Sequence, residues 1–500
     1  MTETFDVVIV GSGGGALTGA HLAAKAGLSV VVVEKTDLVG GTSAYSGGAC
    51  WLPGSAVQRR AGTADSTESA RRYLAALLDG GSDEDKVDAF LTHAPELVDA
   101  LEADEGFAFE WLPFPEYFDA PGRVPGGRSI QPVKIRRDAL PPEAAALVRP
   151  PVEADRVGAA GRRTLTGGQA LVARLLAMAL RDGGVVRTGH RVTGLLTDGD
   201  RVAGVVAETA AGRVELRARR GVLLASGGFE GDQPLRDRAG VPGLASWTMA
   251  PSGTNTGEPI LAAQSLGAAT ALLGQGWLCP GPLQPDGRGS FALGFRGGLI
   301  VDATGRRYAN ECLPYDRFGR EMAAAPDRIP SWFVFDFREG GRLPAIAMPE
   351  GDPDAHLAAG TWVRAETIRG LADAMQVDAE RLAATVDRFN ALAAAGADED
   401  FGRGADEYDR FFAGDAALTP VDQPPFTAAR FVLSDLGTKG GLVTDVHGRV
   451  LRGDGSPIGG LYATGNTAAS PVGAVYPAPG VPLGTAMVFA SLAVRHLLRS

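Results

Sequence analysis

The 500-residue sequence predicts an α/β fold in which one domain is interrupted by a second one. Three observations support this prediction. The first is a strand, helix and strand in succession over residues 5–34, and the second is a pair of alternating segments leading into an apolar strand over residues 201–224. The third is an apolar strand followed by a helical pattern over residues 460–497. We expect the two ends of the chain to build one domain around an insertion.

The N-terminal unit begins with a buried strand. Phe5 to Val10 reads FDVVIV, a nearly continuous β-branched run that is typical of a strand covered on both faces of a parallel sheet. A glycine-rich turn, Gly11-Ser-Gly13-Gly-Gly-Ala16, follows it. An amphipathic helix then leads to a second strand, Ser29 to Val33, which ends at Glu34.

Each part of this unit suits a dinucleotide. Gly11 makes the tight turn, Gly13 lets the backbone approach a pyrophosphate, and Ala16 permits close packing of the helix. The helix N-terminus offers oriented N–H groups to the phosphates. Glu34 lies at about the 20-residue offset where a carboxylate accepts a hydrogen bond from a ribose hydroxyl. The unit therefore predicts a Rossmann-type dinucleotide site.

Further segments distinguish FAD from NAD. Gly40-Gly41-Thr-Ser and Ser46-Gly47-Gly48 are expected to run extended along a longer cofactor, and they resemble the GG(T/S) segment of glutathione-reductase-like and fumarate-reductase-like flavoproteins. Gly221 to Phe229 resembles the ATGG strand of those proteins, and Gly460 to Asn466 resembles the strand that returns to the flavin. A terminal helix is expected after Gly484, with its positive end toward the flavin. The resemblance implies non-covalently bound FAD.

The residues expected to bind FAD come from every one of these segments, together with Val192, which precedes the predicted hairpin. They are Gly11, Ser12, Gly13, Gly14, Gly15, Ala16, Glu34, Lys35, Gly40, Gly41, Thr42, Ser43, Ser46, Gly47, Gly48, Val192, Ala225, Ser226, Gly227, Gly465, Asn466, Pro482 and Leu483.

The insertion is expected to form an α+β catalytic domain. We place it at residues 275–435, so that residues 1–274 and 436–500 form the glutathione-reductase-like FAD-binding domain. It follows a helical stretch around Ile260 to Leu266 and a Pro/Gly-rich turn, Cys279-Pro-Gly-Pro. Inside it, Gly298 to Val301 predicts a strand and Ala365 to Ala395 a helical pattern.

Composition argues against several classes of function. A formal net charge of −11 disfavours nucleic acid as a partner. The three cysteines, Cys50, Cys279 and Cys312, are far apart, so neither a disulfide framework nor a metal site is expected. Residues 1–6 lack a basic region, and no apolar run reaches the roughly 20 residues of a membrane span. We expect a cytoplasmic protein and leave peripheral membrane contact open.

Several motifs together resemble the 3-ketosteroid Δ1-dehydrogenases, which introduce a C1–C2 double bond into steroid ring A. They comprise the N-terminal fingerprint, Phe-Pro-Glu-Tyr117, Asn310-Glu-Cys-Leu-Pro-Tyr315-Asp-Arg, Asp398-Glu-Asp-Phe-Gly-Arg-Gly404, Ser434-Asp-Leu-Gly-Thr-Lys-Gly-Gly441 and Tyr476-Pro-Ala-Pro-Gly480.

The resemblance implies specific roles for these residues. Tyr476 and the Gly480 N–H would polarise the C3 carbonyl, and Tyr315, supported by Tyr117, would remove the C2 proton while C1 gives a hydride to flavin N5. The implied substrate is a 3-ketosteroid such as androst-4-ene-3,17-dione, and the implied partner is an external electron acceptor such as a quinone.

The mechanism is physically sound but demanding. A proton next to a ketone becomes removable when preorganised donors stabilise the enolate oxygen. An unperturbed tyrosine has a pKa of about 10, so holding it ionised at neutral pH costs about 4 kcal/mol. A hydrogen bond from Tyr117 would lower that cost. Ala478 and Pro479 replace glycines that are more common in this loop of the family, which puts the substrate preference in doubt.

Three other functions remain open from the sequence. A fumarate-reductase-like enzyme would need converging arginines for a dicarboxylate, for which Arg306, Arg307, Arg317 and Arg320 are candidates. A steroid Δ4-dehydrogenase of related fold would use a similar apolar site. A flavin carrier or sensor would not turn over at all.

Overall fold

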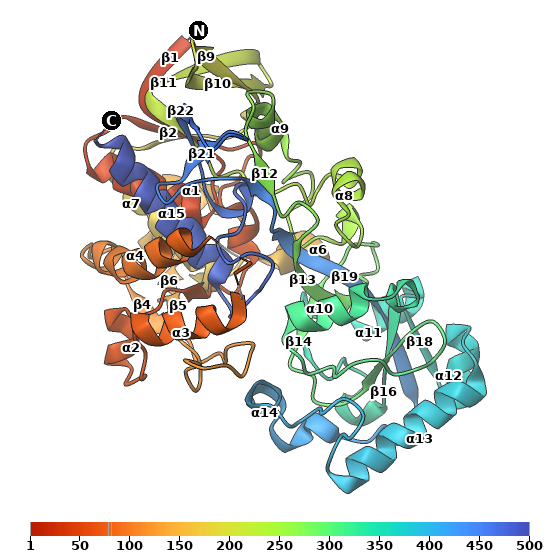
Figure 1. The fold of residues 1–500 in the computed structure, drawn as a ribbon. Coiled ribbons are helices and arrows are strands. Elements are labelled where there is room, and N and C mark those ends of the chain that lie inside the picture. The colour runs from red at the N-terminus through yellow and green to blue at the C-terminus, as the bar shows by residue number, and fades with distance from the viewer. Residues whose placement is uncertain (1, 79, 82, 500) are drawn as a thin grey trace. The chain divides into compact units, whose positions relative to one another are not determined.

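The computed structural model describes residues 2–78, 80–81 and 83–499, which divide into two compact units (Figure 1). The first unit comprises residues 1–241, 250–275 and 437–500, and the second comprises residues 242–249 and 276–436. Residues 242–249 group with the second unit although the segments on either side of them belong to the first. The N- and C-terminal parts of the chain thus build one unit.

An eight-stranded sheet organises the first unit. Its order is β21-β22-β10-β11-β1-β2-β8, with β9 paired to β10. The strands are β1 (Thr2–Val10), β2 (Val30–Val33), β8 (Val185–Arg187), β9 (Arg191–Asp198), β10 (Arg201–Thr209), β11 (Gly212–Leu224), β21 (Arg449–Leu451) and β22 (Pro457–Ala463). The strand β1 runs parallel to β11 and β2. The predicted hairpin is confirmed, because β10 and β11 pair antiparallel and β11 continues into the apolar strand beside β1.

Both faces of β1 are covered by apolar side chains. Val8 and Val10 belong to one hydrophobic cluster with the β9–β11 strands. Val7 and Ile9 belong to another, which includes residues of α1 (Gly14–Lys25) and α15 (Val481–Leu497). This alternation explains why the FDVVIV run is apolar at every position from Val7 onward.

The terminal helix begins earlier than the sequence suggested. It starts at Val481, with Gly480 as its N-cap, rather than after Gly484. Pro482 occupies the first turn, where its fixed φ and missing N–H are tolerated. Two prolines near the start obscured the helical period.

The remaining elements of the first unit surround this sheet. They are β3 (Cys50–Trp51), α2 (Ala56–Arg60), α3 (Thr67–Leu78), α4 (Glu84–Glu102), β4 (Phe109–Trp111), β5 (Ser129–Pro132), β6 (Ile135–Arg136), α5 (Pro142–Leu147), α6 (Val152–Val157), β7 (Thr164–Leu165), α7 (Gly167–Arg181), α8 (Gln233–Ala239), α9 (Glu258–Gln264), β12 (Thr270–Ala271) and β20 (Gly441–Leu442).

The second unit is built on a five-stranded sheet of order β13-β19-β16-β15, with β18 also paired to β19. Its elements are β13 (Gly276–Pro282), β14 (Phe291–Leu293), β15 (Leu299–Val301), α10 (Tyr315–Ala323), β16 (Ser331–Phe335), β17 (Ile346–Met348), α11 (Pro353–Ala359), β18 (Trp362–Ala365), α12 (Ile368–Met375), α13 (Ala379–Ala395), α14 (Glu407–Ala413) and β19 (Phe426–Thr438).

The helical pattern over 365–395 is confirmed, as two helices, α12 and α13. Two other local predictions were wrong. Cys279-Pro-Gly-Pro is part of strand β13 rather than a turn, and its prolines are tolerated because β13 lies at the edge of its sheet. The segment after Gly40 is not fully extended, because residues Gly41–Tyr45 form a 3₁₀ turn, η1.

A buried lysine makes the stability of the first unit depend on pH. Lys86 of α4 donates from Nζ to Thr444 Oγ1 at 2.8 Å, and its Nζ lies 5.2 Å from the Phe489 ring centroid. Burial lowers the pKa of Lys86 to about 8. Between pH 8 and 10 the unfolded chain therefore holds a proton that the folded chain has released, and stability rises with pH. Below pH 8 the folded protein carries the full cost of the buried charge.

Lys86→Met should therefore stabilise the protein most below pH 8, by up to about 3 kcal/mol before the lost Thr444 bond is counted. The gain should shrink toward pH 10. Thermal unfolding midpoints of both proteins at pH 7 and pH 10 check this. A gain of equal size at both pH values would contradict it.

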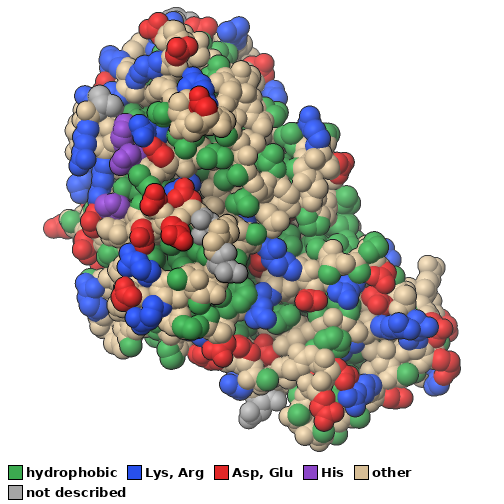
Figure 2. Space-filling view, viewed as in Figure 1, with side chains coloured by type: hydrophobic (Ala, Val, Ile, Leu, Met, Phe, Trp, Pro, Cys, Tyr) green, Lys and Arg blue, Asp and Glu red, His purple; other side chains and the backbone are tan. Residues whose placement is uncertain are grey.

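Among the described residues, no helix combines the length and apolarity needed to cross a membrane. Figure 2 shows acidic and basic side chains interspersed over the visible face.

Candidate active site

The carboxyl ends of four strands meet at the glycine-rich loop. Gly11 N donates to Val33 O at 2.8 Å, Ala225 N donates to Val10 O at 2.8 Å, and Thr464 N donates to Leu224 O at 3.0 Å. The loops after β1, β2, β11 and β22 therefore lie side by side. Ligands of parallel α/β sheets bind at this edge.

The loop between β1 and α1 is shaped for close approach. Gly13 is the N-cap of α1, and as a glycine it has no side chain with which to cap that end. Gly14 N donates to Ser43 Oγ at 3.0 Å, which holds the η1 segment against the helix N-terminus. The oriented N–H groups and the helix dipole at this end favour a phosphate.

Gly11 admits no side chain. Its φ is +98°, and a Cβ built on it would lie 2.4 Å from Ala225 O and 2.7 Å from Ser226 Cα. Gly11→Ala should therefore displace the loop and release FAD. We expect purified Gly11→Ala to hold less than about a tenth of the wild-type flavin, measured as the 450/280 nm absorbance ratio.

The matched control is Gly27→Ala. Gly27 has a similar φ of +84°, but no described atom lies within 4 Å of its added Cβ. Gly27→Ala should lower the free energy of unfolding only by the backbone strain, about 1 kcal/mol. Equal flavin loss in both variants would show that the effect is not specific to the loop.

Glu34 is placed to receive a ribose hydroxyl. The side chain is buried, Oε2 accepts from Ser12 Oγ at 2.5 Å, and Oε1 accepts from Thr36 N and Thr36 Oγ1, each at 2.9 Å. A carboxylate has about four acceptor positions, so one remains for a further donor.

The segment after Gly40 lines open space. At Gly41 and Gly47 an added Cβ would meet no described atom within 4 Å, whereas at Gly40 and Gly48 it would clash. Thr42 Oγ1 accepts from Asn255 Nδ2 at 3.3 Å. A backbone that is fixed on one side and open on the other suits an extended cofactor, and these residues fit FAD.

Most of the expected cofactor residues gather at this sheet edge. Those that do so are Gly11, Ser12, Gly13, Gly14, Gly15, Ala16, Glu34, Gly40, Gly41, Thr42, Ser43, Ser46, Gly47, Gly48, Ala225, Ser226, Gly227, Gly465, Asn466, Pro482 and Leu483. Lys35 turns toward Thr256, to which Nζ donates at 2.6 Å. Val192 lies in β9 and contributes to the hydrophobic core.

Two of the three predicted tyrosines meet in the first unit. The rings of Tyr117 and Tyr476 pack edge to face, with centroids 5.2 Å apart, and both side chains are buried. Tyr117 N donates to Pro477 O at 3.0 Å, and Tyr73 Oη donates to the same carbonyl at 2.8 Å. The loop around Tyr117 and the Tyr476 loop (residues 474–480) are thus joined directly.

Several carbonyls of the Tyr476 loop already accept hydrogen bonds. Pro479 O accepts from Ser129 Oγ at 2.7 Å, and Gly480 O accepts from Trp51 N at 3.0 Å. Within the described residues, the Gly480 N–H has no recorded acceptor. A Cβ at Gly480 would lie 2.5 Å from Ala49 C, so only glycine fits. Gly480 N–H is therefore available as a donor beside Tyr476.

Tyr315 belongs to the second unit. It is the first residue of α10, its side chain is buried, and its ring packs edge to face on Phe291 with centroids 4.8 Å apart. The N-terminal end of a helix favours negative charge.

Two of the sequence motifs form one buried ion cluster in the unit that carries Tyr315. Glu311 is fully buried and accepts from Arg307 Nε and Arg403 Nη1, each at 2.9 Å. Arg307 also donates to Asp398 at 2.8 Å. Burial raises the pKa of Glu311, but the two arginines outweigh it and hold that pKa below its usual range. The Asn310–Arg317 and Asp398–Gly404 motifs therefore fix the start of α10.

Three buried residues near the tyrosine pair were not singled out from the sequence. Arg128 donates to Glu116 at 2.7 Å, next to Tyr117 in the chain. Tyr73 donates to Pro477 O, and Lys439 Nζ donates to Ala474 O at 2.8 Å. Lys439 belongs to the Ser434–Gly441 motif, so the sequence did offer a signal for it. No local sequence pattern distinguishes Arg128 or Tyr73.

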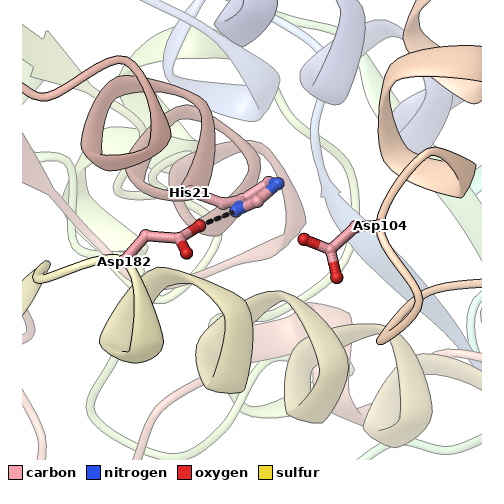
Figure 3. A group of neighbouring side chains, drawn as sticks. All are labelled: His21, Asp104 and Asp182. Carbon is pink, nitrogen blue, oxygen red and sulfur yellow. Dashed lines mark ion pairs between the residues drawn. The ribbon is translucent and has the colours of Figure 1, made fainter.

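One group of potential metal ligands occurs among the described residues. His21, Asp104 and Asp182 converge in Figure 3, with His21 Nδ1 3.0 Å from Asp182 Oδ2. Arg181 donates to Asp104 Oδ2 at 2.6 Å and to Asp182 Oδ1 at 2.9 Å. Arg181 already compensates both carboxylates, which disfavours a cation between them.

Comparison with known proteins agrees with FAD as the cofactor. The FAD binding domain family model matches residues 6–483. A 3-oxosteroid 1-dehydrogenase of Rhodococcus opacus is 40% identical, covering 100% of this chain and 99% of the relative. A 4-oxocyclohexanecarboxylate 2-dehydrogenase of Sinomonas cyclohexanicum is 36% identical, covering 99% of this chain and 93% of the relative.

A solved structure is similar over the same length. The 3-ketosteroid Δ1-dehydrogenase of Sterolibacterium denitrificans, crystallised with 1,4-androstadiene-3,17-dione, superposes with a TM-score of 0.91 at 32% identity, covering 99% of this chain and 100% of that one. The predictions of the fold class and of FAD as cofactor are confirmed. The chain belongs to the FAD binding domain family, among the flavin-dependent dehydrogenases that include the 3-oxosteroid 1-dehydrogenases.

Proposed function

We propose that this protein introduces a C1–C2 double bond into 3-ketosteroids. The observation that carries the proposal is the Tyr117–Tyr476 pair beside the Gly480 N–H, in a chain that is similar over its full length to 3-oxosteroid 1-dehydrogenases. The substrate class follows from those relatives and from the apolar, aromatic surroundings of the pair.

We assign a separate role to each of these residues. Tyr476 Oη and Gly480 N donate to the C3 carbonyl oxygen and stabilise the enolate that forms when the C2 proton leaves. Tyr315, as the phenolate, receives that proton at Oη and becomes a neutral phenol, and Tyr117 would stabilise the phenolate by a hydrogen bond. When bound, FAD supplies the acceptor for the C1 hydride.

Two of the four arginine candidates for a dicarboxylate site are engaged in ion pairs. Arg307 is committed to Glu311 and Asp398, and Arg320 donates to Asp316 at 2.8 Å. A fumarate-like substrate needs arginines that are free to converge on its carboxylates. This pairing favours a neutral ketone over a dicarboxylate.

Anaerobic titration tests the proposal. Androst-4-ene-3,17-dione should bleach the flavin at 450 nm, and product analysis should place the new double bond at C1–C2. A double bond elsewhere would indicate a different regiochemistry, and a flavin that stays yellow with every 3-ketosteroid would indicate a carrier. Bleaching by 4-oxocyclohexanecarboxylate alone would assign a monocyclic substrate.

Reoxidation identifies the electron acceptor. We propose a quinone in this role, and a soluble quinone should restore the yellow flavin in the same cuvette faster than oxygen does.

A further inference from the structure

We propose that Ser129 is a positioning residue that aims the Gly480 N–H at the carbonyl oxygen of the substrate. The inference rests on the proposed function, because it takes Gly480 N as a donor to the C3 oxygen. Ser129 Oγ donates to Pro479 O at 2.7 Å. Ser129 is inaccessible to solvent, so water does not compete for this hydrogen bond.

The carbonyl that Ser129 binds belongs to the same peptide unit as the proposed donor. The Pro479–Gly480 bond is trans. A trans peptide is planar, with its C=O and N–H pointing in opposite directions. The hydrogen bond that holds Pro479 O therefore also sets the direction of the Gly480 N–H, which points away from Ser129. A hydrogen bond at the carbonyl polarises the amide as well and strengthens its N–H as a donor, by about 10–30% per bond.

The hydroxyl of Ser129 reaches this peptide from a fixed base. Ser129 of β5 lies opposite Trp51 of β3 in the antiparallel pair of these strands. Trp51 N donates to Gly480 O at 3.0 Å, and Leu112 N donates to Ser129 O at 2.9 Å. The two peptide units that meet at Gly480 are thus held by two paired strand residues, Ser129 and Trp51.

The Gly480 peptide needs such a hold. A donor stabilises developing charge best when it already points to the place where the charge forms. The orientation of the Pro479–Gly480 peptide depends on ψ of Pro479 and φ of Gly480, and glycine permits a wide range of φ. Gly480 has a φ of +88°. The bond from Ser129 selects one orientation of this peptide from those that a glycine allows.

Removing the hydroxyl should lower kcat rather than binding. We expect Ser129→Ala to retain FAD and to change KM by less than about threefold, with kcat lowered about tenfold, less than for loss of a direct oxyanion donor. Ser331→Ala is the matched control. Ser331 is equally buried, and its Oγ donates to Arg328 O at 2.6 Å, a carbonyl that belongs to none of the proposed donors. Ser331→Ala should keep the wild-type kcat.

A spectroscopic readout tests the direction of the donor. A steroid with a phenolic ring A carries its oxygen where the enolate oxygen would lie, and its ultraviolet spectrum reports ionisation of the phenol. The bound phenol should be more ionised in the wild type and in Ser331→Ala than in Ser129→Ala at the same pH. If Ser129 only stabilised the fold, Ser129→Ala would lower thermal stability and FAD content and leave this ionisation unchanged.

The outcomes are distinct. Equal kcat and equal phenol ionisation in the wild type and Ser129→Ala would overturn the proposal while leaving the dehydrogenase function standing, and equal losses in Ser129→Ala and Ser331→Ala would overturn it too. A wild type that forms no 1,2-desaturated product would refute the proposed function itself.

A second variant covers the case in which Ser129→Ala does not retain FAD. Ser129→Cys nearly keeps the volume of the side chain, and its thiol is only a weak donor. Lower kcat and lower phenol ionisation than in the wild type would then support the proposal, and wild-type values of both would overturn it.

Discussion

Tyr315→Phe is expected to bind FAD and steroid normally and to lose turnover by about three orders of magnitude, within the range for removal of a positioned general base. The phenylalanine keeps the edge-to-face contact with Phe291, so α10 should retain its place. Only the oxygen that we propose receives the C2 proton is removed. Stopped-flow flavin reduction with androst-4-ene-3,17-dione, together with the dissociation constant of the steroid, measures both effects.

Tyr308→Phe is the matched control in the same unit. Tyr308 is also buried, and its hydroxyl lies 2.8 Å from Ser331 Oγ, away from the proposed chemistry. It should cost about 1 kcal/mol of stability through the lost hydrogen bond and leave flavin reduction unchanged. Near-normal reduction in Tyr315→Phe, or equal loss in both variants, would refute Tyr315 as the base.

The sequence predicted best what is encoded locally. The β1-α1-β2 unit follows from a continuous apolar run, a glycine turn and an amphipathic helix within 30 residues of one another, and each part has its own physical signature. In the β10–β11 hairpin, side chains alternate between the two faces with a period of two. This alternation can be recognised in the sequence without knowing any distant contact.

It predicted less well where tertiary context overrides local preference. The prolines in β13 led to the prediction of a turn. Only the sheet order shows that this strand lies at an edge, where it needs few N–H donors. Gly41–Tyr45 curls into η1 because Ser43 Oγ accepts from Gly14 N, a contact with a distant segment. Neither partner is visible along the chain.

The site shows the same limit. Tyr117, Tyr315 and Tyr476 were identified through resemblance, since nothing in periodicity or spacing distinguishes them from packed tyrosines. Tyr117 and Tyr476 meet because Pro477 O accepts from Tyr117 N and Tyr73 Oη. The role of Tyr315, which lies in the second unit, stays a proposal. A buried arginine such as Arg128 is rare enough that no composition rule would predict it.

Arg128→Met is expected to destabilise the protein by about 3–5 kcal/mol, the usual cost of removing one partner from a buried ion pair. Arg128 donates to Glu116 Oε1 at 2.7 Å and to Asp65 Oδ1 at 3.0 Å, and all three side chains are inaccessible to solvent. Its loss would leave two uncompensated carboxylates, one of them next to Tyr117. Thermal unfolding of the flavin-loaded protein measures the loss, and flavin reduction should slow with it.

The pH dependence of that variant identifies the cause. Burial raises the pKa of both Glu116 and Asp65, and without Arg128 this effect is unopposed. Carboxyls with a raised folded pKa bind more protons in the folded state, so their contribution to stability is lost as pH rises. Arg128→Met should therefore be closest to wild type near pH 5 and furthest from it at pH 7. Adding Glu116→Gln should recover part of the lost stability, because it removes one buried charge. If the cause were instead a cavity left by the shorter side chain, neither pH nor Glu116→Gln would change the loss of stability.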